Sequence, residues 1–470
     1  MTRTVSTRLG PPNGTSRREL LRAGGLGLMG GLSLPRLLQV AAASPAALRG
    51  RARSVILLNL FGGPPHQDLF DLKPDAPDTV RGEFRPISTS LPGVQICELL
   101  PKTARLMDRA TLIRTYSHRY NSHNPYNVLT GFDLGNDAQN YFAKRTDHPG
   151  IGAVCQYFGL GSSEIPPYVI LPAFPGYTQA LRRAGPYGGY LGSQYDPLFT
   201  MCEPTFARES TGDYDSVEAM GVPFPPSLEV IPEITPARLE SRQALLARVG
   251  HRLSLPESGL AVRRADESSR KAFALLTSAK TRDAFDLSLE SEALRDEYGR
   301  NLWGSGVLMA RRLIEAGSRF VNVHWEAKGG NHWDLHANNF GMLRVLLPQL
   351  DRLTSALVLD LEQRGLLDET LVIVMGEMGR SPKINGNAGR DHWPQCGFCL
   401  MFGGGTKRGC VIGATDAQAA WPADRPVSAG DMAATIYHLL GVDPELTVPD
   451  LSGRPIPISH GGEPVWEMLA

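Results

Sequence analysis

Four short apolar runs, each followed by acidic or histidine residues, constrain the fold of this chain more than any other feature. The clearest run spans residues 371–375 and has no polar alternation, which is typical of a parallel strand covered by helices on both faces. The others span residues 54–60, 110–115 and 319–324. Because ligands of open α/β sheets bind outside the carboxyl ends of the strands, we expect the polar residues that follow these runs to meet in one site.

Amphipathic periodicity between the runs predicts helices over residues 236–253, 268–279, 302–316 and 340–363. Strands that alternate with helices indicate an α/β fold, in which a mostly parallel central sheet is flanked by helices. We expect a single domain over residues 54–460, with residues 159–300 forming an insertion that is first loop-rich and then helical. Long loop-rich segments usually lie on the surface, and this one could cover the site as a lid.

The composition is that of a globular protein, with 42% hydrophobic residues in a chain of 470. Basic and acidic residues number 48 each, so the formal charge is zero. Because the first 43 residues hold six Arg and one Glu, the remainder of the chain is slightly acidic. No basic surface for nucleic acid is therefore indicated.

The basic start resembles a twin-arginine signal peptide over residues 1–43. Residues 16–22 read SRRELLR, a short apolar and glycine-rich run follows over residues 23–34, and small residues at 41–43 suit cleavage near Ala43. The alternative is a basic helix with frayed ends. Because the apolar run is too short to span a bilayer, we expect a periplasmic or otherwise exported protein without a stable membrane span, with the twin-arginine export machinery as a partner.

Carboxylates and imidazoles recur together after the apolar runs. Asp334 and His336 are two residues apart, which in an extended segment places both side chains on one face. Asp391 and His392 repeat this mixture of carboxylate oxygen and imidazole nitrogen, which suits zinc or a similar divalent ion. Any one pair could equally be hydrogen-bonded loop residues, but the sets together favour a metal site. The predicted metal ligands are His66, Asp68, Asp334, His336, Glu377, Asp391 and His392.

Two arginines adjoin the last of these sets. Arg380 and Arg390 could clamp a tetrahedral oxyanion, because a planar guanidinium donates two parallel hydrogen bonds. Surface ion pairs with Glu377 or Asp391 are the alternative, and the sequence favours neither interpretation over the other.

Several long motifs resemble domain-of-unknown-function family 1501. They are GGPPHQDLFD at residues 62–71, LTGF at 129–132, HWDLHANNF at 332–340, GEMGRSPKINGNAGRDHW at 376–393 and RPVSAGDMAATIYHLLGVDP at 425–444. The resemblance covers nearly all of the chain after the leader. It implies a fold similar to the alkaline phosphatase and sulfatase superfamily, and members of the family often carry twin-arginine leaders.

The resemblance also implies positions for catalytic residues. Sulfatases carry a Cys or Ser nucleophile upstream of a Leu-Thr-Gly ending, and counting back from Gly131 reaches Asn121 and then Ser122. Pro125 stands where a formylglycine sulfatase has an arginine, so that class is not expected. Ser122 is then the candidate nucleophile, activated by a nearby histidine or a metal. The predicted catalytic residues are Ser122, His123, Arg380 and Arg390.

Two further positions depart from the superfamily pattern. Acidic residues directly after the first strand would fall at Phe61 and Gly62, which cannot bind a metal. The Asp-His pair after the strand at 371–375 corresponds to Glu377 and Met378, so a carboxylate is kept and an imidazole is lost. The resemblance therefore implies the fold but not a standard two-metal phosphatase.

We expect an exported metal-dependent hydrolase of phosphate or sulfate esters, with a small-molecule or saccharide ester as substrate and zinc as the first-choice cofactor. The alternative is a catalytically degenerate protein of alkaline phosphatase-like fold that binds or scaffolds without turnover, which the missing acidic pair at Phe61 and Gly62 favours. A mutase of the same superfamily fits less well, because export removes the protein from the usual sugar phosphates.

Overall fold

The computed structural model describes residues 50–135, 140–161, 164–226, 241, 278–327 and 332–470. The predicted leader over residues 1–43 and nearly all of the predicted helices 236–253 and 268–279 lie outside the described residues. Among the residues described, no helix combines the length and the apolar character needed to cross a bilayer.

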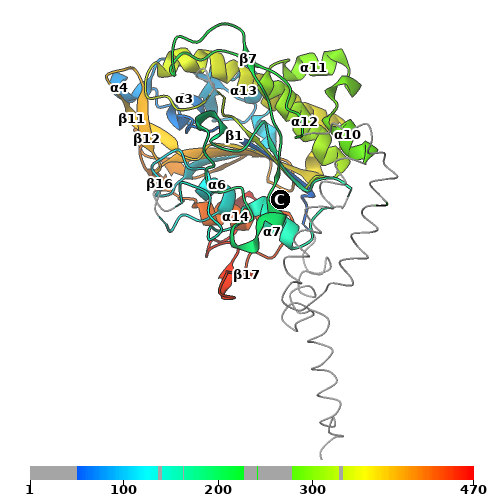
Figure 1. Ribbon diagram of the computed structural model, residues 1–470. Coiled ribbons are helices and arrows are strands. Elements are labelled where there is room, and N and C mark those ends of the chain that lie inside the picture. Colours follow the sequence, from blue (N-terminus) through cyan, green and yellow to red (C-terminus); the bar gives the residue numbers. More distant parts are fainter. Residues whose placement is uncertain (1–49, 136–139, 162–163, 227–240, 242–277, 328–331) are drawn as a thin grey trace, which may run out of the picture. The chain divides into compact units, whose positions relative to one another are not determined.

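A sheet forms the centre of the fold (Figure 1). It has eight strands in the order β14-β4-β13-β10-β1-β9-β5-β6. Its strands are β1 (Ser54–Asn59), β4 (Ala110–Tyr116), β5 (Tyr168–Leu171), β6 (Leu198–Phe199), β9 (Phe320–His324), β10 (Thr370–Met375), β13 (Gly397–Phe402) and β14 (Cys410–Ile412). Neighbouring strands pair in parallel except where β13 pairs with β4 and β10. All strands but β13 therefore run in one direction.

Helices cover both faces of this sheet, and alternate residues of a strand face opposite cores. Ile56 and Leu58 of β1 pack with α12 (Leu302–Ala316) and α13 (Asn339–Gln363), whereas Val55 and Leu57 pack with α7 (Ile151–Tyr157) and α14 (Ala429–Leu439). Figure 1 shows the two pairs of helices on opposite sides of the sheet. Helices bury both faces of the strands, and burying each large apolar side chain stabilises the fold by about 1.5–3 kcal/mol. Apolar residues therefore occupy both faces. The predicted α/β fold with a mostly parallel sheet flanked by helices is confirmed.

The helices predicted at residues 302–316 and 340–363 are present as α12 and α13. Asn301 caps α12 by accepting a hydrogen bond from Gly304 N, and the helix ends at Gly317 in the left-handed region. In α14, Ser428 and Asp431 form a reciprocal capping box. These polar end signals lie at the boundaries that the apolar periodicity indicates.

Four segments meet at one edge of the sheet, because β4, β10, β1 and β9 run in the same direction and end there. After β10 the chain forms a hairpin of β11 (Gly379–Ile384) and β12 (Arg390–Trp393), in which Arg380 pairs with His392. The segment after β9 returns to the end of β1, where Trp333 N donates to Phe61 O at 2.7 Å. The polar residues that follow the four strands are thereby brought to one side of the molecule.

Candidate metal centre

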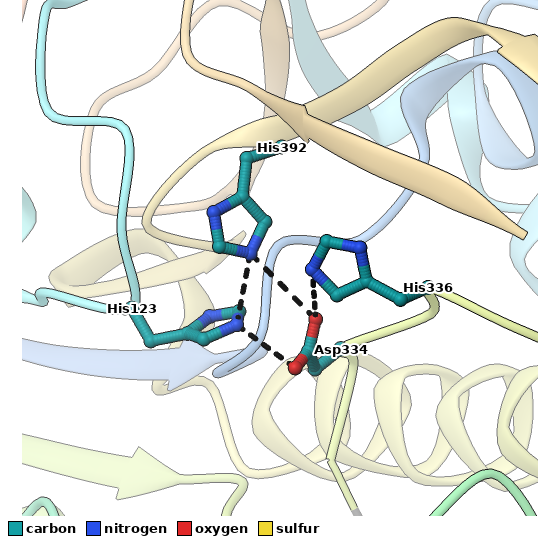
Figure 2. Close-up of side chains that lie close together, drawn as sticks. All are labelled: His123, Asp334, His336 and His392. Carbon is teal, nitrogen blue, oxygen red and sulfur yellow. Dashed lines mark hydrogen bonds and ion pairs between the residues drawn. The ribbon is translucent and has the colours of Figure 1, made fainter.

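Four side chains converge at the carboxyl edge of the sheet: His123, Asp334, His336 and His392 (Figure 2). One ligand atom of each takes part, and these atoms all lie within 4.8 Å of one another. His123 belongs to the loop after β4, and His392 belongs to β12. Asp334 and His336 belong to the segment after β9. All four side chains are partly exposed, so a ligand from solution can reach them.

Four separations between the candidate ligand groups are close to those around a four-coordinate ion. His123 Nε2 lies 3.0 Å from Asp334 Oδ2 and 3.0 Å from His392 Nε2. Asp334 Oδ1 lies 3.2 Å from His336 Nε2 and 3.7 Å from His392 Nε2. Tetrahedral zinc with bonds of about 2.0–2.1 Å holds neighbouring ligand atoms roughly 3.3–3.4 Å apart. These four separations are close to that value, although they use Asp334 Oδ2 toward His123 and Asp334 Oδ1 toward the other two rings.

Two of the imidazoles are held from behind by carboxylates. His123 Nδ1 lies 3.1 Å from Glu377 Oε1, and His336 Nδ1 lies 3.1 Å from Asp391 Oδ1. A carboxylate in this position accepts a hydrogen bond from Nδ1–H, which leaves the Nε2 lone pair for a metal; this is the common arrangement around zinc-bound histidines. Glu377 and Asp391 thus support the ligands, although the sequence suggested them as ligands.

The contact between two imidazoles requires a proton or a metal ion between them. His392 Nδ1 lies 3.1 Å from the carbonyl oxygen of Asn121, which can only accept, so this ring carries a proton on Nδ1. His123 Nδ1 faces the Glu377 carboxylate in the same way. The two Nε2 lone pairs then face each other at 3.0 Å, which is repulsive unless a proton or a metal ion separates them.

The charges around the centre favour a protonated His123 and an ionised Asp334, which contact each other. Burial is the largest single effect and by itself raises the pKa of Asp334 and lowers the pKa of His123. The hydrogen bonds and charges of their neighbours together outweigh burial, so the pKa of Asp334 is lowered and that of His123 is raised. The buried Arg380 adds to the effect by donating to Asp334 Oδ1 at 2.6 Å. Without a metal the centre is a network in which His123 carries a proton that a metal ion would displace.

The loop-rich part of the chain helps to fix His123. Arg183 Nη1 donates to the carbonyl oxygen of His123 at 2.6 Å, and its guanidinium lies over the ring of Phe61 at 5.2 Å. The Phe61 ring in turn lies 5.7 Å from the His123 ring. Phe61, which lies just beyond the end of β1, therefore packs behind the His123 ring but is not itself a metal ligand.

Three of the predicted site residues lie apart from the cluster. Asp68 accepts hydrogen bonds from Arg390 Nε at 2.7 Å and Arg390 Nη2 at 2.9 Å. All five N–H groups of the buried Arg390 donate to Asp68 or to backbone carbonyl oxygens, so none is free for a substrate. His66 Nε2 lies 2.7 Å from Ala419 O. This differs from the expectation that His66 and Asp68 bind metal and that Arg390 clamps an oxyanion. Asp68 and Arg390 bind each other and support the β11–β12 hairpin, and His66 contacts Ala419 outside that hairpin.

The other two predicted catalytic residues adjoin the centre. Arg380 donates to the carbonyl oxygens of Gly62 and Gly63 as well as to Asp334, so its guanidinium is largely committed within the protein. Its clearest effect is to hold the Asp334 carboxylate. Ser122 Oγ is buried and has no hydrogen-bond partner among the described residues, and its neighbour in the chain is His123.

Sequence reasoning missed three features of the centre. His123 stands among the ligand atoms, although the sequence suggested a catalytic role, and the backbone carbonyl of Asn121 orients His392. His332 Nδ1 accepts from Asp334 N at 3.1 Å, so a neutral His332 carries its proton on Nε2, and burial lowers its pKa. In the sequence, the only sign of the roles of Asn121 and His123 is that His and Asn residues gather after the run at 110–115. This grouping does not reveal which ring faces which partner.

Comparison with protein families gives one match over almost the whole described chain. The sequence model of the family described as "Protein of unknown function (DUF1501)" matches residues 52–469. No curated protein matches the chain.

Several solved structures resemble the fold. The lipoteichoic acid synthase LtaP from Listeria monocytogenes is 12% identical with a TM-score of 0.35, and the match covers 85% of this chain and 74% of that one. The PsFucS1 sulfatase from Pseudoalteromonas sp. is 11% identical with a TM-score of 0.36, over 87% and 72% of the two chains. The phosphonate monoester hydrolase SpPMH from Silicibacter pomeroyi is 11% identical with a TM-score of 0.35, over 88% and 78%. At this level of similarity, the activity has to be argued from the residues of the chain itself.

Proposed function

We propose that this chain, which belongs to the DUF1501 family of proteins of unknown function, is a metal-dependent hydrolase of phosphate or sulfate esters. The proposed ligands are His123, Asp334, His336 and His392. The observation that carries the proposal is the convergence of three Nε2 atoms and one carboxylate, with each imidazole oriented through its Nδ1. Zinc is the proposed ion, because imidazole and carboxylate ligands at this spacing suit it.

The charge of the centre favours an anionic substrate. When bound, a divalent ion supplies a Lewis acid that polarises an ester oxygen and lowers the pKa of water. A divalent ion with its four direct ligands carries a net positive charge, because only Asp334 among them is negatively charged, and Arg380 offsets that charge. The carboxylates of Glu377 and Asp391, behind two of the imidazoles, reduce the charge of the wider centre. Phosphate and sulfate monoesters are attracted to such a centre, and the partial exposure of the ligands leaves it open to them.

Two nucleophiles are compatible with this centre. In the first route Ser122 Oγ bonds to the phosphorus or sulfur atom, the alcohol leaves with the serine proton, and water then releases the acid and restores the serine. In the second route water attacks directly and one of its protons goes to the alcohol. Ser122 Oγ is buried and hydrogen-bonds to no base among the described residues, which favours the second route. We expect Ser122→Ala to abolish turnover in the first route and to leave most of it in the second.

Export through the twin-arginine route into the periplasm is part of the proposal. It rests on the sequence SRRELLR at residues 16–22 and the short apolar run that follows. Replacing both Arg17 and Arg18 by lysine is expected to keep the protein in the cytoplasm. Cell fractionation with immunodetection checks this, and an unchanged distribution would count against the route.

Metal content provides the first test of the centre. Protein purified without chelator is expected to carry about one zinc per chain, whereas His336→Ala combined with His392→Ala carries negligible metal. His438→Ala is the matched control, because His438 lies on α14 and contacts Trp466 instead of the centre. Equal metal contents in the wild type and the double variant, with circular dichroism showing both folded, would contradict the proposal.

A protein that binds without turnover is the second candidate function. The observation that favours it is the lack of an acidic residue at Phe61 and Gly62, together with the commitment of Arg380 and Arg390 to protein groups. A panel of phosphate and sulfate esters assayed with Zn, Mn, Mg and Ca separates the two candidates. Hydrolysis that Asp334→Asn abolishes establishes the enzyme, and metal binding without hydrolysis of any ester supports the binding protein.

A further inference from the structure

The loop between two short strands lies next to the metal centre. These strands are β7 (Thr205–Phe206) and β8 (Ala219–Met220), which pair antiparallel, and we call residues 207–218 the Tyr214 loop. Asn338 Nδ2 donates to the carbonyl oxygen of Tyr214 at 2.9 Å, and Asn338 follows the ligand His336 by two residues. The Asp334 carboxylate also acts on Tyr214, because burial first and Asp334 second raise the pKa of the tyrosine. Tyr214 is thus near a ligand and tied to the segment that carries it.

The Tyr214 loop is braced from within. Arg208 Nη1 and Nη2 donate to the two carboxylate oxygens of Asp215 at 2.6 and 2.5 Å. Thr211 N donates to Asp215 Oδ2 at 2.8 Å. A bidentate contact of this kind adds geometric order that a single ion pair on the surface lacks. These contacts order the backbone of the loop on either side of Tyr214, which reduces the entropy lost on binding a ligand.

The side chain that this loop presents is 36% exposed, and single exposed aromatic residues are common on proteins. What sets Tyr214 apart is that it combines this exposure with a braced loop, a tie to Asn338 and the proximity of a ligand. We propose that Tyr214 contacts the alcohol part of the ester substrate, and that this alcohol is a saccharide or a similar polyhydroxylated ring. The inference rests on the proposed function, since it names the substrate class of the same centre.

The two ends of such a substrate differ in charge and shape, and each end suits a different part of the site. The proposed metal ion and its direct ligands take the phosphate or sulfate group, whereas the carboxylate of Asp213, next to Tyr214 in the chain, repels that group at the loop. A neutral ring with hydroxyl groups has no such penalty at the loop. Its C–H face can lie on the tyrosine ring, and its hydroxyl groups can donate to the Asp213 carboxylate.

Binding of two sulfate esters to the zinc-loaded protein tests the inference without requiring turnover. Glucose 6-sulfate carries a ring that Tyr214 can contact, and ethyl sulfate carries none. We expect Tyr214→Ala to weaken the binding of glucose 6-sulfate about fivefold, since aromatic contacts contribute about 1 kcal/mol, and to change the binding of ethyl sulfate less than twofold. Ligand-observed NMR titration gives both dissociation constants, and the zinc content of the variant is expected to equal that of the wild type.

Two further variants separate contact from structure. Asn338→Gly removes the hydrogen bond to Tyr214 O and suits the left-handed backbone at residue 338, so an intermediate loss for glucose 6-sulfate is expected. Trp466→Ala removes an exposed aromatic side chain that contacts His438 and is expected to change neither constant.

The outcomes are distinguishable from those of the proposed function. Equal losses for both esters, no loss for either, or loss of zinc in Tyr214→Ala would overturn the inference, as would a wild type that does not prefer glucose 6-sulfate. Selective loss for glucose 6-sulfate without hydrolysis of either ester would sustain the inference and refute the hydrolase.

Discussion

The imidazoles of the metal centre differ in how firmly each is held. Glu377, which orients His123, is 1% exposed and also accepts from Gly62 N at 2.8 Å. Asp391, which orients His336, is exposed to solvent. Because water competes with the exposed contact and not with the buried one, Glu377 is expected to determine the position of its imidazole more strongly.

Neutralising these two carboxylates measures that difference. Glu377→Gln is expected to weaken zinc binding by roughly 10–100-fold, because its amide accepts the Nδ1 proton of His123 less strongly. Asp391→Asn is expected to weaken zinc binding by less than about tenfold, as water can replace the lost interaction. Competition with a chromogenic chelator gives both affinities, with thermal unfolding as a control for folding. Equal effects of the two variants would show that burial of the carboxylate does not matter.

At the residue scale, the sequence predicts which residue types bind the metal better than it predicts which side chains contact each other. The pairs around Asp334, His336 and His392 could be recognised because the metal-binding residue types recur after apolar runs. The pairing of Asp68 with Arg390 could not, since these residues are 322 positions apart and either could have faced the cluster. A long-range ion pair depends on side-chain directions that composition and local spacing do not determine.

At the element scale, the end of β1 explains why this centre lacks an acidic ligand there. Gly62 has φ +118°, and a Cβ atom on it would lie 2.3 Å from Asp334 N and 2.4 Å from Trp333 C. The backbone that carries Asp334 therefore packs directly against residue 62. An acidic side chain at this position would displace the segment that supplies two ligands.

Gly62→Ala tests this close approach. We expect loss of about 1–3 kcal/mol of unfolding free energy from backbone strain, with further loss from the contact, and weaker zinc binding. Gly159→Ala is the matched control, because Gly159 has φ +81° but a Cβ atom on it would meet no other atom within 4 Å. The control is expected to lose about 1 kcal/mol and to bind zinc normally. Urea unfolding and zinc titration measure the two effects, and normal zinc binding by Gly62→Ala would contradict the account.

Two histidines, His148 just before α7 and His460 in the C-terminal segment, lie against each other. The rings of His148 and His460 lie 4.5 Å apart, and Phe132 stacks on His148 at 4.1 Å. Burial lowers the pKa of His148 to about 4 and that of His460 to about 3. In the unfolded chain both pKa values return to about 6.5, so the unfolded state binds more protons between these limits.

The stability that these histidines contribute should therefore depend on pH with a known sign. It is fully present above pH 6.5 and is lost as the pH falls from 6.5 toward 3–4, with a slope of at most about 1.4 kcal/mol per pH unit for each group. Replacing both histidines by glutamine is expected to flatten the fall in unfolding free energy between pH 6.5 and 4. Urea unfolding across this range compares the two proteins, and parallel pH profiles would exclude the contribution.

At the scale of the whole molecule, the parallel sheet could be predicted because its strands are buried on both faces and alternate with helices. The exception is β13, which runs antiparallel between β4 and β10. Its residues are as apolar as those of its neighbours, so the sequence pattern does not reveal whether the strand runs parallel or antiparallel to them. The insertion of β13 leaves the ends of β4 and β10 at the same edge, which is why the predicted convergence of polar segments survives it.

Metal binding should stabilise the whole fold, since the four ligands come from three segments that are far apart in the sequence. An ion that binds the folded state alone raises the free energy of unfolding by about 2.7 kcal/mol at a free concentration one hundred times its dissociation constant. The unfolded chain cannot bring these ligands together, so most of this increase is expected for zinc. Urea unfolding in zinc buffers measures it, and the variant that combines His336→Ala with His392→Ala is expected to show none. An equal increase in that variant would place the stabilising ion elsewhere in the protein.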